Sequence, residues 1–123
     1  MQGGRILIKH QAVALRLADM ATKLEATRAL LERAAAAVDA KASDADALCN
    51  MAKLFASEEI LKVATHAVEL HGGNGMMLDF GVEKVFRDAA IFPHMDGTTD
   101  ISRFKIVKAM FPDTAGKYAG PEA

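Results

Sequence analysis

Cysteine, tryptophan and proline are scarce in this sequence of 123 residues, which contains one, none and three of them respectively. The single cysteine, Cys49, cannot form an internal disulfide, which excludes a disulfide-stapled secreted module, and we expect the chain in a reducing compartment, the cytoplasm. Apolar runs of the roughly 20 residues that cross a bilayer are also missing. Residues 1–4 lack the pattern of a secretory or transit leader and are expected to be the start of a fragment.

An excess of charge of either sign is missing as well. The formal net charge is −1, from 15 basic and 16 acidic residues that are interspersed along the chain. Without a basic patch or a strong field, neither nucleic acid nor a membrane surface is expected as a partner. Alanine is abundant, aromatic residues are few and β-branched residues form no runs, a composition that favours helices over strands.

Apolar residues recur at helical spacing in the first half of the chain. A first helix is predicted from about residue 6 to residue 39, with one apolar stripe expected in the core. That stripe consists of Val13, Leu17, Met20, Leu24, Leu31 and Ala34. A polar turn follows over residues 40–46, and a second helix continues to about His71, where Gly72 and Gly73 predict a left-handed C-cap.

Two shorter helices are predicted in the second half. One runs from about Val82 to Ala90, and the last begins after Thr98 or Thr99, one of which is expected to be its N-cap. The chain is therefore predicted to be a single all-α domain, a four-helix up-and-down bundle, with a frayed tail over residues 113–123.

The candidate binding sites lie at two breaks between the helices. At residues 71–75, glycines would let exposed N–H groups hold a phosphate, and a plain helix C-cap is the alternative. At residues 95–100, Asp96 beside Gly97 would suit a base next to a binding surface, and an N-cap cluster is the alternative. His66 and His71 are five residues apart, so no metal site is expected, and Cys49 is expected to be a small packed side chain.

The order of several short motifs is more specific than any one of them. In chain order they are His10-Gln11-Ala12-Val13, Leu17-Ala18-Asp19-Met20-Ala21, Met51-Ala52-Lys53-Leu54-Phe55-Ala56-Ser57-Glu58, Leu70-His71-Gly72-Gly73-Asn74-Gly75, Val82-Glu83-Lys84, Arg87-Asp88-Ala89 and Asp96-Gly97-Thr98. Over about residues 4–110, this series resembles the C-terminal helical domain of the flavin-dependent acyl-CoA dehydrogenases.

The resemblance implies a longer subunit, with an N-terminal helical domain, a middle β-domain and FAD bound between the middle and C-terminal domains. It implies α,β-dehydrogenation of an acyl-CoA, in which a carboxylate removes the α-proton and the β-hydrogen leaves as hydride to the flavin. It also implies electron-transferring flavoprotein as the electron acceptor, and a homo-oligomer, either a dimer or a tetramer, built through the helical domain.

Position by position, the resemblance implies Asp96 as the catalytic base and Gly97 as a glycine beside the acyl thioester. The positions that match FAD contacts within the same subunit are Thr98, Thr99 and Asp100. A further flavin-contacting pair is matched by His10 and Gln11. The stretch that approaches the flavin diphosphate from the neighbouring subunit is matched by Glu69, Leu70, His71, Gly72 and Gly73.

Two positions depart from the family's pattern. Asp96 stands where glutamate is usual and is shorter by about 1.5 Å, while a misplacement near 1 Å costs on the order of a hundredfold in rate. Aspartate at this place is also a feature of nitroalkane oxidases and of some members that act on alicyclic acyl-CoAs. Glu69 stands where glutamine is common, and its carboxylate would repel a diphosphate unless it faces away or is protonated.

Three hypotheses follow. The first is an acyl-CoA dehydrogenase domain with Asp96 as its base, the second an oxidase branch of the same superfamily, and the third a non-catalytic helical partner subunit. Because the rest of the flavin site and acyl pocket lies outside these residues, the 123-residue chain alone is expected to bind no FAD tightly and to be inactive. Its uncovered apolar faces are expected to drive self-association.

Overall fold

The structure, a computed structural model, describes residues 3–113 and is built from helices in that range. Its four α-helices are α1 (Gln11–Asp39), α2 (Ala45–His71), α3 (Val82–Ile91) and α4 (Thr99–Met110). Its short 3-10 helices are η1 (Leu7–Lys9), η2 (Gly72–Met76) and η3 (Leu78–Phe80). The predicted all-α, four-helix class is confirmed. The predicted frayed tail lies outside the described residues, apart from Asp113.

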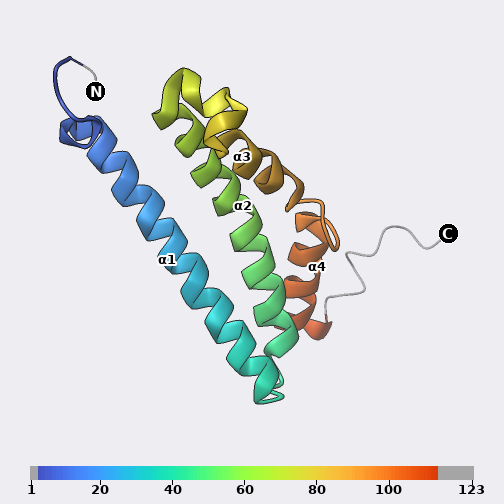
Figure 1. Ribbon diagram of the computed structural model, residues 1–123. Coiled ribbons are helices and arrows are strands. Elements are labelled where there is room, and N and C mark those ends of the chain that lie inside the picture. Colours follow the sequence, from blue (N-terminus) through green and yellow to red (C-terminus); the bar gives the residue numbers. More distant parts are fainter. Residues whose placement is uncertain (1–2, 114–123) are drawn as a thin grey trace.

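Helix α2 is the central element. It forms an antiparallel hairpin with α1, and α3 and α4 follow one another along the other side of α2 (Figure 1). Since α3 and α4 together run about the length of α2, they act as one interrupted third layer. The break in that layer, between Ile91 and Thr99, therefore lies against the middle of α2 rather than at an end of the bundle.

The first helix begins later than its periodicity predicts. Residues Leu7–Lys9 form a 3-10 turn, His10 is extended at φ −87° and ψ 122°, and the α-helix starts at Gln11. The predicted start near residue 6 is therefore wrong by about one and a half turns. Position 10 is neither glycine nor proline, so no residue type indicates a break there. The prediction followed the apolar spacing alone and therefore placed the start of the helix too early.

Small residues fill the best-buried part of the α1–α2 hairpin. Ala34, Leu48 and Ala52 form a buried cluster, against which Leu30 and Met51 pack. Alanine at these contacts lets the two helix backbones approach closely. In this half of the hairpin the core therefore depends on close approach rather than on large side chains.

Part of the apolar stripe predicted for the core is instead on the surface. Leu17, Leu24 and Leu31 are 37%, 39% and 49% exposed, and Val38 continues the same row. We call these four residues the outer stripe. The physical reason is that α1 packs along its length against α2 only, so one side of α1 is covered and the adjoining apolar row is not.

An ion-pair network also joins α1 to α2. The Glu59 carboxylate accepts from Lys62 and lies 3.2 Å from the Lys23 ammonium of α1. The hydrogen bond from Lys62, more than the one from Lys23, lowers the pKa of Glu59 below its ordinary 4.5, although partial burial opposes the shift. A lowered pKa means that this carboxylate stabilises the fold above its ordinary pKa, and that the contribution disappears as the pH falls through the lowered value.

No helix in residues 3–113 is both long and apolar enough to cross a membrane.

Candidate functional site

The residues singled out from the sequence fall into two groups in the structure. The first, the helix-end group, comprises His10 and Gln11 at the start of α1 and residues 69–73 at the end of α2, which lie at the same end of the hairpin (Figure 1). The second comprises the Asp96 turn, which we define as residues 95–98 between α3 and α4, together with Thr99 and Asp100 at the start of α4. Lys53, which contacts the Asp96 turn, and Glu69 are 16 residues apart on α2, a separation of about 24 Å along a helix axis. The two groups therefore form separate surfaces.

Glu69 is paired within the chain. Its carboxylate accepts a hydrogen bond from the Arg16 guanidinium at 2.7 Å, and both side chains are about half exposed. The expectation that Glu69 must face away or be protonated to tolerate a nearby diphosphate therefore misses a third solution, in which Arg16 supplies the compensating positive charge. Sequence reasoning overlooked Arg16, because it belongs to α1 and its partner lies 53 residues away.

The backbone at the end of α2 is open at two glycines. Gly72 has φ +57° and ψ −138°, so the predicted positive φ is present but the full left-handed helical cap is not. A Cβ atom added at Gly72 or at Gly73 would meet nothing within 4 Å. Gly72 needs glycine for its positive φ, whereas nothing in the chain requires it at Gly73, and the exposed backbone of both leaves room for another group to approach closely. Beside it, His71 Nδ1 lies 2.8 Å from the Ala67 carbonyl oxygen and donates to it.

Gly75 differs from these glycines because it is buried. A Cβ at this position would lie 2.5 Å from the Val68 carbonyl oxygen and 3.0 Å from its Cα. The 3-10 turn η2 thus folds back onto the last turns of α2, and only a residue without a side chain fits at the contact. This packing fixes the position of the open Gly72 and Gly73 backbone relative to the end of α2.

The Asp96 turn has an unusual backbone. Asp96 has φ +53° and Gly97 has φ +95°, two successive residues in conformations that side-chain-bearing residues seldom adopt. Aspartate tolerates such a conformation better than most residues. Across the base of the turn, the Thr99 N–H donates to the Pro93 carbonyl at 3.1 Å. The result is a tight loop with an exposed Asp96 at its tip.

Thr98 and Asp100 fix the start of α4. The Thr98 hydroxyl accepts from the Ile101 N–H at 3.4 Å, which confirms Thr98 as the N-cap. Asp100 pairs with Arg103 at 3.1 Å, and Arg103 also binds Glu58 on α2. The hydrogen bond from Arg103 to Glu58 is the main reason why the pKa of Arg103 is raised further above its ordinary range. The N-cap alternative therefore describes Thr98 correctly but leaves Asp96 unexplained, because Asp96 precedes the cap.

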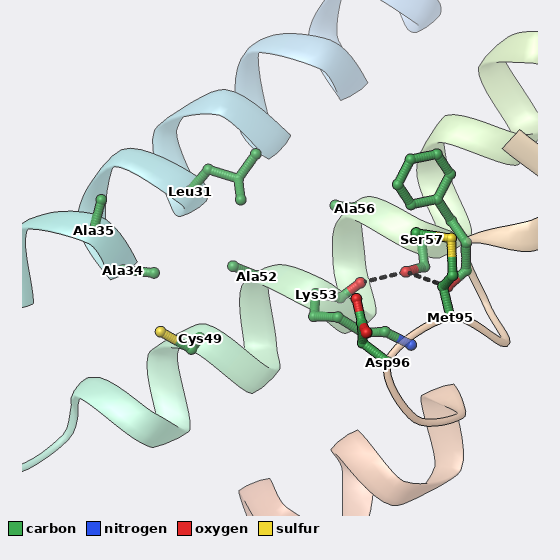
Figure 2. Close-up of a pocket in the computed structure, with 11 residues that line it drawn as sticks. Leu31, Ala34, Ala35, Cys49, Ala52, Lys53, Ala56, Ser57, Met95 and Asp96 are labelled. Carbon is green, nitrogen blue, oxygen red and sulfur yellow. Dashed lines mark hydrogen bonds between the residues drawn. The ribbon is translucent and has the colours of Figure 1, made fainter. Parts of the chain in front are cut away.

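An apolar pocket of about 530 Å³ opens beside Asp96, between α1, α2 and the segment 92–96. Leu31, Ala34 and Ala52 line one side of it, whereas Lys53, Ser57, Met95 and Asp96 gather on the other (Figure 2). Cys49 also lines it and is exposed, so the prediction of a packed cysteine is wrong. A carboxylate at the edge of an apolar pocket is an arrangement that suits proton transfer to or from a bound apolar molecule.

Lys53 links this pocket to the Asp96 turn. Its Nζ donates to the Gly97 carbonyl oxygen at 2.6 Å. One turn along α2, the buried Ser57 hydroxyl, only 2% exposed, lies 2.7 Å from the Lys53 carbonyl and 3.3 Å from that of Phe92 (Figure 2). Sequence reasoning noted Lys53 only as part of a motif. The sequence feature that could have identified Lys53 is that it is a lone cation in an otherwise apolar helical segment.

Among residues 3–113, no three His, Cys, Asp or Glu side chains gather as metal ligands would. The two groups of residues offer a carboxylate, an apolar pocket and the open backbone at Gly72 and Gly73. These are means of binding an organic group and moving a proton.

Comparison with known proteins agrees with this description. Residues 1–111 match the family model of the acyl-CoA dehydrogenase C-terminal domain. The chain is 38% identical over 112 residues to cyclohexane-1-carbonyl-CoA dehydrogenase of Geobacter metallireducens, covering 91% of this chain and 29% of that protein. It is also 38% identical over 105 residues to subunit CarC of the caffeyl-CoA reductase–Etf complex of Acetobacterium woodii, covering 85% of this chain and 27% of the relative.

A solved structure, an FAD complex of PigA, superimposes with a TM-score of 0.84 at 29% identity, over 89% of this chain and 28% of that one. The chain thus spans less than a third of the length of the relatives it matches. Because the family model covers nearly all of the described residues, the chain belongs to the acyl-CoA dehydrogenase family, whose C-terminal helical domain it forms.

Proposed function

We propose that this chain is the C-terminal domain of an FAD-dependent acyl-CoA dehydrogenase and that Asp96 is its catalytic base. The observation that supports this most is the position of Asp96. It stands at the edge of an apolar pocket of about 530 Å³, on a tight turn next to Gly97. In this role Asp96 would take the α-proton of an acyl-CoA thioester whose acyl group occupies the pocket.

FAD is the cofactor that we propose, and the residues present are compatible with it. Gly72 and Gly73 leave open backbone for a diphosphate, and Arg16 balances the charge of Glu69 at the same place. Thr99 and Asp100 begin α4, whose N-terminal N–H groups favour an anionic group. A bound flavin would accept the β-hydrogen as hydride.

Each of the two groups would contact a different flavin. We propose that Thr98, Thr99 and Asp100 contact the FAD of their own subunit. His10, Gln11 and the backbone of residues 69–73 would form the other contact surface, with residues 69–73 directed at the FAD of a neighbouring subunit. The distance of about 24 Å between the groups along α2 supports this division.

The partners we propose are electron-transferring flavoprotein and further copies of the same subunit. CarC, the relative from Acetobacterium woodii, is by its name a subunit of a complex with Etf. The outer stripe and the apolar residues beyond α2, among them Leu78 and Phe80, are exposed in this chain. Such surface is normally covered by other domains or subunits.

Self-association of the chain tests whether its exposed apolar faces are covered by further copies of the same subunit. Because these apolar faces are uncovered, the 123-residue chain is expected to form dimers or larger species at micromolar concentrations. Sedimentation velocity measures this directly. A monomer across that concentration range, with a helical circular dichroism spectrum, would contradict a role of these faces in assembly.

Activity is tested in a chimera that joins residues 1–111 of this chain to the part of the Geobacter metallireducens relative that they do not match. We expect the purified chimera to be yellow with bound FAD, and its flavin to bleach without oxygen when an alicyclic or straight-chain acyl-CoA is added. The unmodified relative is the positive control. The 123-residue chain alone, mixed with FAD and desalted, is expected to be colourless, and stoichiometric flavin on it would contradict the need for the missing domains.

The other two hypotheses predict different results in the same experiment. Aspartate in place of glutamate at position 96 is the observation that favours an oxidase, and reduction by a nitroalkane but not by any acyl-CoA would establish that function. A folded chimera that binds no flavin would instead indicate a non-catalytic partner subunit.

A further inference from the structure

Lys53 is the only side chain on α2, among those the structure describes, with a recorded hydrogen bond to the backbone of the Asp96 turn. Its ammonium donates to the Gly97 carbonyl at 2.6 Å, across 44 residues of sequence. The acceptor is the carbonyl of the residue that directly follows Asp96. Lys53 is half-buried and lines the same pocket as Asp96 (Figure 2).

We propose that Lys53 is a positioning residue, which holds the Asp96 turn in its left-handed conformation and thereby sets the place of the Asp96 carboxylate. The inference rests on the proposed role of Asp96 as base. In this role the Lys53 ammonium bonds neither the reacting atoms of the substrate nor the flavin, although the Lys53 stem lines the pocket. The ammonium acts through the backbone of Gly97.

The backbone of the turn explains why such a hold is needed. Asp96 carries a side chain and has a positive φ, a conformation that persists only where the surroundings fix it. Gly97 follows with a positive φ that glycine adopts freely. A hydrogen bond from an ammonium is stronger than one between neutral groups, so Lys53 is a suitable donor for this purpose. The other hydrogen bonds of the turn lie at its two ends, and none of them involves the Gly97 carbonyl. They join the Met95 N–H to the Ile91 carbonyl, the Thr99 N–H to the Pro93 carbonyl, and Thr98 to the first turn of α4.

The backbone of α2 at Lys53 is itself connected to the segment before the Asp96 turn. Ser57 is buried and its hydroxyl lies within hydrogen-bond distance of the Lys53 and Phe92 carbonyls, so it bridges α2 to the segment that leads into the turn. The segment before the turn is therefore held to α2 by Ser57, and the turn itself by Lys53.

The turn itself is tested on the 123-residue chain by amide hydrogen exchange. In Lys53→Met, the Thr99 amide is expected to exchange at least tenfold faster than in the unmodified chain, whereas the Val63 amide in α2 is unchanged. Lys53→Arg, which keeps a cationic donor, should restore most of the protection. Lys62→Met, on the same helix but paired with Glu59, is the matched control and should leave Thr99 unaffected. Unchanged exchange at Thr99 in Lys53→Met, or equal acceleration at Val63, would overturn the proposal.

The consequence for the reaction is tested in the FAD-loaded chimera. A base displaced by about 1 Å costs on the order of a hundredfold, so Lys53→Met should lower kcat between tenfold and a hundredfold while KM changes less than threefold. The isotope effect on an α-deuterated acyl-CoA should rise, because proton removal becomes slower, and Lys53→Arg should recover most of the rate. A rise in KM with unchanged kcat would place Lys53 in substrate binding and overturn the positioning role.

Failure of the proposed function gives a different result from failure of this inference. If acyl-CoA does not bleach the unmodified chimera, Asp96 is not an acyl-CoA base, and the exchange measurements still decide whether Lys53 holds the turn. If the unmodified chimera is active and Lys53→Met is equally active, the positioning role is wrong while the proposed function stands.

Discussion

Asp96→Asn in the chimera is expected to lower the rate of acyl-CoA-dependent flavin bleaching by roughly 10²–10⁴-fold, the usual contribution of a positioned general base. Asparagine keeps the size of the side chain and also tolerates the positive φ of 53° at this position. The substitution therefore removes the basic group with little change to the turn. Stopped-flow absorbance of the flavin without oxygen measures the rate.

The matched control is Asp88→Asn. Asp88 is an exposed aspartate on α3 that pairs with Lys84, and it lies outside both groups of site residues. It should leave the bleaching rate within twofold. Flavin content and unfolding temperature should be the same in both variants, because neither carboxylate is buried. Normal bleaching in Asp96→Asn would remove Asp96 as the base.

Gly75→Ala is expected to destabilise the 123-residue chain by about 1–3 kcal/mol, the usual cost of forcing extra volume into a packed contact. The added Cβ would lie 2.5 Å from the Val68 carbonyl oxygen, a backbone atom inside α2 that cannot move away as a side-chain end would. The unfolding temperature should fall by roughly 5–15 °C for a domain of this size. Thermal denaturation followed by circular dichroism measures it.

Gly73→Ala, two residues earlier in the same 3-10 turn, is the control. A Cβ at Gly73 meets nothing within 4 Å, so the unfolding temperature should change by less than 2 °C, an estimate that follows from the small effect of most surface substitutions. Equal effects of the two alanines would mean that η2 does not pack on α2 as described.

Much of the helix pattern was predictable because local signals mark most of the helix ends. Gly72 ends α2 and Thr98 caps α4, as their residue types indicate. The start of α1 was not predictable, since His10 is extended without any residue that forces it to be. Periodicity also could not tell which of two adjoining apolar rows on α1 would face α2, because both have helical spacing.

The candidate site was predictable only in its local parts. Asp96 and the glycines were singled out because each stands in a recognisable stretch of sequence. Arg16 and Lys53 were not, because their partners Glu69 and Gly97 lie 53 and 44 residues away and meet them only in the folded chain. Ion pairs between helices, and hydrogen bonds from a helix to a distant loop backbone, could therefore be identified only from the structure.

The outer stripe constrains the shape of whatever surface covers α1. Its members, Leu17, Leu24, Leu31 and Val38, recur every seven residues. On a straight α-helix, two turns take 7.2 residues, so a seven-residue repeat slips backwards by about 20° at each step. Over the three steps from Leu17 to Val38 the row winds by about 60° in the left-handed sense. A straight partner helix laid parallel to α1 would leave one end of the row in water, whereas one inclined or coiled to the left would follow it throughout.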